Sequence, residues 1–224
     1  MADFTGLNPL VAKSNIGEFN DQGMTIFYDL SYYNKLFIDS LSSVWFSPNA
    51  VEFGKEFTPE LYNSEAETQV LVNNTIVNCV AAYNALATSQ GLPAIADDRT
   101  AMTVENYAPQ GTNMGYNDML DISPDGVVGM DKEKARAYLE EYRNNINLVQ
   151  AELDGFPLSI AFYDPAGEIL AAFTDAVKKL KEKLEANYTK MSDTIGSRLV
   201  EEENKVVTGA RTAASELSGG ATAA

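Results

Sequence analysis

The stretch VWFSPNAVEF at residues 44–53 decides how this chain folds. Apolar side chains recur every three or four residues before it and again after it, which is the spacing of an amphipathic helix. Pro48 lacks a backbone N–H and therefore suits the first position of a helix, and Ser47 suits the N-cap position before it. We predict that one helix ends near Trp45, that the chain bends at Phe46 and Ser47, and that a second helix begins at Pro48.

The helices on either side of this bend are defined by their apolar stripes. The first, residues 24–45, carries Phe27, Leu30, Phe37, Leu41 and Val44. Asn34 occupies a position on this stripe, where it either fixes the helix register or faces a water molecule. The second, residues 48–90, carries Leu61, Val72, Ile76, Cys79, Tyr83 and Leu86. We expect Cys79 to be a buried, unreactive thiol, and the glycine and proline at residues 91–93 to end this helix.

The second half of the chain repeats this plan. Its first helix carries Ala135, Leu139, Tyr142, Ile146, Val149, Leu153 and Phe156, and Pro157 should interrupt it. Its second helix, from Pro165 to about Val207, carries Phe173, Val177, Leu180, Leu184, Tyr188, Met191, Ile195, Leu199 and Val206. The bend between them reads AFYDPAGEIL at residues 161–170. Aligned on the prolines, the two bends pair Trp45, Phe46, Ser47 and Pro48 with Phe162, Tyr163, Asp164 and Pro165.

These patterns predict an all-α protein made of two long helical hairpins, residues 24–91 and 131–207. Sustained spacing of three and four residues at this length is typical of helices packed as an antiparallel four-helix bundle or coiled coil. The remaining segments are expected to be an N-terminal surface segment at 1–23, a connecting loop at 92–130 and a flexible tail at 208–224.

The composition excludes several classes of function. With 32 acidic and 16 basic residues, the chain carries a net charge of −16, which disfavours binding to nucleic acid. It has no histidine and one cysteine, so Ser-His-Asp triads, histidine zinc sites and internal disulfides are absent. We expect no cofactor. We find no basic segment followed by an apolar core near residue 1 and no run of 18 apolar residues, so we expect neither a cleaved signal peptide nor a membrane span.

The Trp45-Phe46-Ser47 bend resembles the Trp-Xaa-Gly (WXG) helical hairpins of type VII secretion. In that family a glycine follows the tryptophan by two positions, where Ser47 stands here. The resemblance covers residues 24–90 and, less closely, residues 131–207. It implies four-helix bundles made by pairing two hairpins, so a chain with both hairpins looks like a fused dimer. It also implies a protein that is exported folded or that serves as an export partner.

The export tag of that family, a tyrosine followed four residues later by an acidic residue, is not found here. Tyr188 is followed at that distance by Ser192, and Tyr142 by Ile146. The chain is therefore expected either to be secreted without a cleaved signal peptide or to stay in the cytoplasm.

Three further features have alternative interpretations. Trp45 is either a recognition element for a partner or a core anchor at the bend. Asp121, Ser123 and Asp125 are spaced like the first ligands of a calcium loop, but Lys132 stands where that loop needs a bidentate acid. A turn followed by a helix cap explains the same residues without a metal. Tyr28 and Tyr32, one turn apart and off the apolar stripe, are candidate interface residues.

We expect a non-catalytic, type VII secretion-associated protein, either a secreted substrate or its partner or chaperone. It would act through helical contacts with other proteins, such as type VII components or further copies of itself. The alternative is a self-assembling structural or scaffold protein, surface-exposed or phage-derived, built from coiled-coil helices. A third hypothesis is an enzyme with a carboxylate site in residues 92–130.

Overall fold

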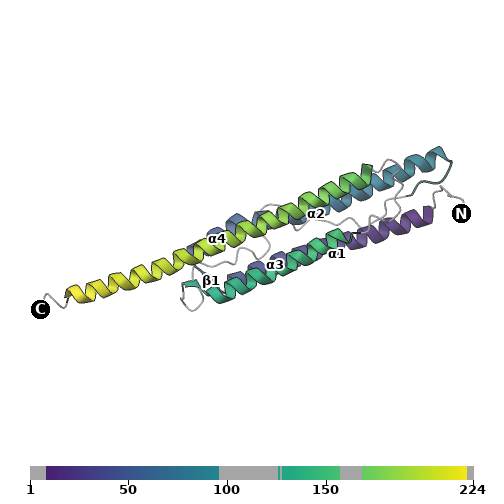
Figure 1. Ribbon diagram of the computed structural model, residues 1–224. Helices are drawn as coiled ribbons and strands as arrows, with labels where there is room; N and C mark the ends of the chain where they lie inside the picture. Colours follow the sequence, from purple (N-terminus) through teal and green to yellow (C-terminus); the bar gives the residue numbers. More distant parts are fainter. Residues whose placement is uncertain (1–8, 96–125, 127, 157–167, 221–224) are drawn as a thin grey trace.

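The computed structural model describes residues 9–95, 126, 128–156 and 168–220, and this part of the chain is mostly helical (Figure 1). Its elements, in chain order, are α1 (Pro9–Ser42), β1 (Trp45–Phe46), α2 (Pro48–Ser89), β2 (Gly129–Met130), α3 (Lys132–Asp154) and α4 (Glu168–Gly220). The all-α class predicted from the sequence is confirmed.

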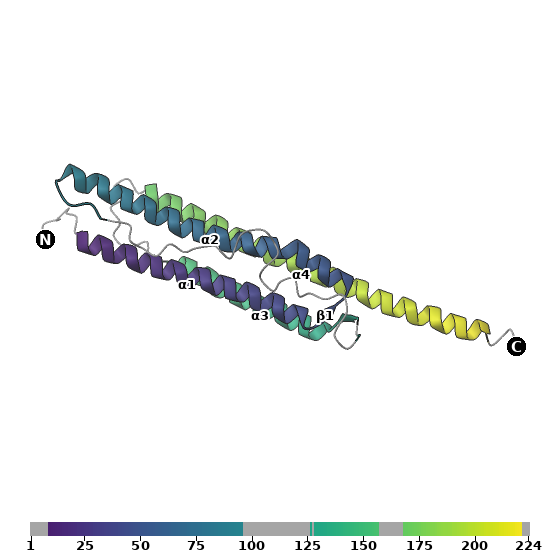
Figure 2. The same cartoon turned by 180° about the vertical axis from the view of Figure 1, so that it is seen from behind.

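The helices lie side by side along one elongated body (Figures 1 and 2). α1 packs against α2 and α3, and α4 packs against the same two helices. The buried apolar side chains of all four helices form a single cluster. α4 continues well beyond the end of the body at which β1 lies (Figure 2).

The apolar stripes predicted from periodicity are largely buried. In α3 every predicted position is buried, with Ala135, Ile146 and Val149 fully enclosed. In α1 the predicted stripe is buried as well, including the polar Asn34. Cys79 is buried in α2, as expected. Val206 is the clear exception, because it is 72% exposed.

The predicted N-terminal surface segment is wrong from Pro9 onward, where the chain is helical. α1 begins at Pro9 and buries Ile16 and Phe19 in the common core. Gly23 lies inside this helix against Val72 of α2. A Cβ atom added at Gly23 would lie 2.5 Å from Val72 Cγ1, so the glycine permits close packing of the two helices.

The tail is also more regular than predicted. α4 remains helical through Gly220, although residues 203–217 are all exposed. This segment contains Ala, Arg, Glu and Leu, which favour helix even without packing. Only residues 221–224 of the predicted tail lie outside the described residues.

α2 ends as the sequence predicts. Gly91 adopts a positive φ of 70°, and the Leu92 backbone N–H donates to the Ala87 carbonyl at 2.8 Å. This is the glycine-terminated hydrogen-bond pattern that commonly closes a helix.

Among the described helices, α2 alone is long and apolar enough to cross a bilayer. A core helix of a water-soluble protein has the same property. α2 places many residues in the core shared by the four helices, and Glu65 is among them.

Candidate functional site

The bend between α1 and α2 is built around Trp45, which is fully buried. Its indole Nε1–H donates to the Ser47 hydroxyl oxygen at 2.9 Å, and its ring lies 5.4 Å from the ring of Phe53. Burial of the large apolar ring stabilises the bend, and the hydrogen bond satisfies its one polar atom. The interpretation of Trp45 as a core anchor is therefore confirmed.

Ser47 takes the N-cap position of α2, with Pro48 immediately after it, as predicted. The expectation that its side chain caps backbone N–H groups is wrong, because that hydroxyl accepts from Trp45 instead. The Ser47 backbone carbonyl accepts from Ala50 N at 2.9 Å and Val51 N at 3.4 Å. A buried indole N–H without a partner would cost free energy. This explains why the Ser47 hydroxyl accepts from the indole rather than from a backbone N–H.

A short pair of strands ties this bend to the start of α3. Trp45 pairs with Met130, and Phe46 with Gly129, in antiparallel register. The Asp131 backbone N–H also donates to the Val44 carbonyl at 2.8 Å. The predicted connecting loop at 92–130 thus ends in a strand that the sequence pattern did not reveal. Gly129 has a φ of 138°, a conformation that side-chain-bearing residues rarely adopt.

Asp131 caps α3, and its Oδ1 accepts from Lys134 N at 3.1 Å. This confirms the helix cap predicted at the end of the calcium-like stretch. The candidate calcium residues Asp121, Ser123 and Asp125 lie outside the described residues. In the part of the chain that the structure describes, no three His, Cys, Asp or Glu residues gather as a metal site.

The second bend also falls outside the described residues. It comprises Phe162, Tyr163, Asp164 and Pro165. The two candidate interface residues, Tyr28 and Tyr32, are 55% and 61% exposed on α1.

A polar network crosses the core where α1, α2 and α3 meet. Asn34, on α1, is fully buried, and its Nδ2 donates to Glu65 Oε1 on α2 at 2.7 Å. The Tyr142 hydroxyl, on α3, donates to Asn34 Oδ1 at 2.8 Å. Asn34 therefore links one group from each of two other helices. Of the two roles expected for this residue, fixing the register of packed helices is the one that its contacts favour.

The network has unusual electrostatics because it lies in the apolar core. Burial raises the pKa of Glu65 from 4.5 to about 7, although hydrogen bonds from Asn34 and Ser31 favour the charged form. Burial also raises the pKa of the Tyr142 hydroxyl, and the nearby Glu65 carboxylate raises it further. Glu65 thus changes its charge near neutral pH inside the protein.

The sequence pattern indicates Asn34 as an unusual core position but not Glu65. The signal was present in α2, because Leu61, Glu65, Thr68 and Val72 continue one stripe by steps of four, three and four. Glu65 and Thr68 are both fully buried on that stripe. Polar residues at such positions are read as breaks in the stripe unless their partners on other helices are known.

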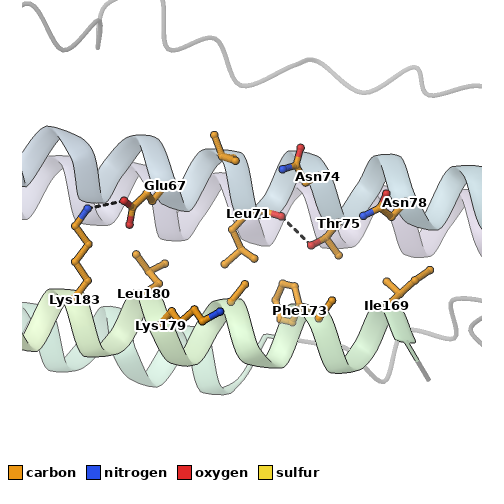
Figure 3. Close-up of a pocket in the computed structure, with 13 residues that line it drawn as sticks. Glu67, Leu71, Asn74, Thr75, Asn78, Ile169, Phe173, Lys179, Leu180 and Lys183 are labelled. Atoms are coloured by element: carbon orange, nitrogen blue, oxygen red, sulfur yellow. Dashed lines mark hydrogen bonds and ion pairs between the residues drawn. The ribbon is translucent and has the colours of Figure 1, made fainter. Parts of the chain in front are cut away.

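An apolar groove of about 480 Å³ runs between α2 and α4 (Figure 3). Leu71 and Thr75 on α2 face Phe173 and Leu180 on α4 across it. At one end Glu67 and Lys183 form an ion pair at 2.5 Å. Its lining combines apolar side chains with polar ones such as Asn74 and Asn78 and with the charged Lys179.

The chain matches no protein-family model, no curated protein and no solved structure.

Proposed function

We propose that this chain is a non-catalytic, type VII secretion-associated protein in which two WXG-like hairpins are joined in one polypeptide. The helices would pack as an antiparallel four-helix bundle, and the protein would be either a secreted substrate or the partner or chaperone of one. Its function would be carried by contacts between its helices and other proteins.

The bend at Trp45 is the observation that supports this proposal best. A tryptophan at a helix–helix bend, followed two positions later by a small residue, is the feature shared with the WXG hairpins. Here the small residue, Ser47, is 1% exposed and lies within hydrogen-bonding distance of the indole. A larger side chain would not fit this buried corner without moving the ring, which gives the spacing a physical reason.

The surface chemistry is compatible with a protein partner. Tyr28 and Tyr32 are exposed on one face of α1, and tyrosine is enriched where proteins meet. The net charge of −16 favours a partner with a basic surface.

The proposal is tested by expressing the tagged chain in its native host. We expect it to co-purify with type VII secretion components or to be found outside the cell in a folded form. If the chain meets neither condition while the host's type VII system is active, the proposal is wrong.

The candidate interface is tested in the same experiment with two variants. Tyr28→Ala combined with Tyr32→Ala should leave the melting temperature unchanged and reduce co-purification. Asp39→Ala, at another exposed position of α1, is the matched control and should have no effect on binding. Equal binding by all three proteins would place the interface elsewhere.

A self-assembling scaffold is the second candidate function. The exposed apolar side chains near the end of α4 favour it, because coiled-coil faces of this kind drive association. A scaffold should form large polymers whose mass grows with concentration, whereas the secretion-associated protein should form a small, defined species.

A further inference from the structure

The end of α4 carries an apolar stripe that no part of the described structure covers. Val206, Val207 and Leu217 are 72%, 46% and 78% exposed. Val206 follows the buried Leu199 by seven residues, so the stripe continues the face that packs in the core. Helices of this length gain most of their stability from packing an apolar face against another element. In a single copy of the chain, the end of α4 has no such packing within the described structure.

The residues that form this stripe between positions 204 and 217 are all uncharged. Its members are Val206, Val207, Ala210, Ala213, Ala214 and Leu217. The charged residues of the segment, Lys205, Arg211 and Glu216, fall at other positions of the helical repeat. Such a face is built to contact another helix rather than solvent.

A groove of about 910 Å³ lies beside the base of this segment. The bend supplies Val44 and Phe46 to its lining, β2 supplies Met130, and α4 supplies Val206 and Val207. The stripe of α4 therefore begins at a groove whose lining is partly apolar and also includes charged residues such as Lys132 and Glu203.

We propose that the end of α4 pairs with the same segment of a second copy of this chain, in antiparallel orientation. The pattern is self-complementary, because Val206 of each copy then lies opposite Leu217 of the other. Ala210 of each copy likewise lies opposite Ala213 of the other. These are the two kinds of layer that an antiparallel coiled coil forms from positions spaced three and four apart.

The same register brings each Leu217 to a groove. Val206 of one copy lines the groove. Leu217 of the other copy lies opposite Val206, and it therefore reaches the opening of the groove near Phe46 and Met130. Leu217, the most exposed large apolar side chain of α4 among the described residues, thus meets the groove beside the bend. The arrangement is two-fold symmetric, so both copies gain the same contacts and the assembly closes as a dimer.

Charge favours the antiparallel orientation over the parallel one. Each copy carries a net charge of −16 and a run of three glutamates at residues 201–203. A parallel pair would place these runs and the two acidic bodies next to each other, whereas an antiparallel pair separates them.

The first test is the mass in solution, measured by sedimentation of the full chain. We expect twice 24.4 kDa for the natural sequence and 24.4 kDa for the double variant Val206→Glu, Leu217→Glu. Thr208→Glu, at an exposed position off the stripe, is the matched control and should remain a dimer. Circular dichroism checks that each variant keeps its helices. A monomeric natural chain, an unaffected double variant or polymers beyond the dimer would each overturn the proposal.

The second test distinguishes the orientation by disulfide trapping. Val206→Cys and Leu217→Cys chains should cross-link only when the two are mixed and oxidised, because the buried Cys79 is not accessible. Cross-linking of Val206→Cys with itself would show a parallel pair and would overturn the antiparallel arrangement. Absence of cross-linking in the mixture would overturn the register. The proposal goes beyond type VII secretion and does not depend on it, since both tests use the purified chain.

Discussion

Replacing Glu65 by glutamine should change how the stability of this protein depends on pH. Burial raises the pKa of Glu65 from 4.5 to about 7, so the folded protein holds this proton more tightly than the unfolded chain. The stabilisation is therefore fully present below about pH 4.5 and is lost as the pH rises to about 7. Each pKa unit corresponds to about 1.4 kcal/mol. The free energy of unfolding of the natural protein should therefore fall by about 3 kcal/mol, through this group alone, as the pH rises over this range.

Glutamine has the shape of the protonated acid and keeps an acceptor oxygen for the Asn34 amide, but it does not titrate. Glu65→Gln and the natural protein should therefore have similar stability near pH 4.5. At about pH 8 the variant should be more stable by up to about 3 kcal/mol. The free energy of unfolding, measured by urea denaturation across this range, gives the comparison directly.

Glu67→Gln is the matched control for this experiment. Glu67 lies two residues further along α2, but its side chain is 53% exposed and pairs with Lys183. Its replacement should cost no more than about 1 kcal/mol and should leave the pH profile of the core unchanged. If Glu65→Gln and the natural protein give parallel pH profiles, the Glu65 carboxyl does not titrate in a buried site and the argument is refuted.

Three further predictions concern packing and are checked by urea unfolding. Gly23→Ala should destabilise the protein by about 1–3 kcal/mol because its methyl group would overlap Val72, whereas Gly17→Ala, with open space around it, should be neutral or stabilising by up to about 1 kcal/mol. Equal effects would mean that α1 and α2 are not in close contact at Gly23. Trp45→Ala should cost about 3–5 kcal/mol, and an unchanged free energy of unfolding would show that the ring is exposed. Tyr142→Phe should cost about 1 kcal/mol by removing a buried hydrogen bond, and a neutral result would mean that the bond to Asn34 is not formed.

The sequence was sufficient to predict the features that depend on local periodicity. The stripes of α1 and α3, the bend at Trp45 and the glycine-ended stop of α2 follow from helix geometry and capping, which act within a few residues. A helix cap after the turn at residues 121–125 was predicted for the same reason, and Asp131 supplies it.

Features that depend on a second segment could not be predicted in this way. Gly23 reads as a helix breaker until Val72 is known to lie against it. Glu65 reads as a solvent-facing acid until Asn34 and Tyr142 are seen beside it. The pairing of Met130 with Trp45 joins residues far apart in the chain, and two-residue strands leave no alternation in the sequence.

The two halves of the chain, α1 with α2 and α3 with α4, share one core. Native-state hydrogen exchange tests it most directly, because it measures the free energy of opening for each segment. Amides near Asn34 in α1, Glu65 in α2 and Tyr142 in α3 should open together with the same free energy. Amides of α3 that open at a distinctly lower free energy than those of α1 and α2 would show two separate hairpins and would contradict the account.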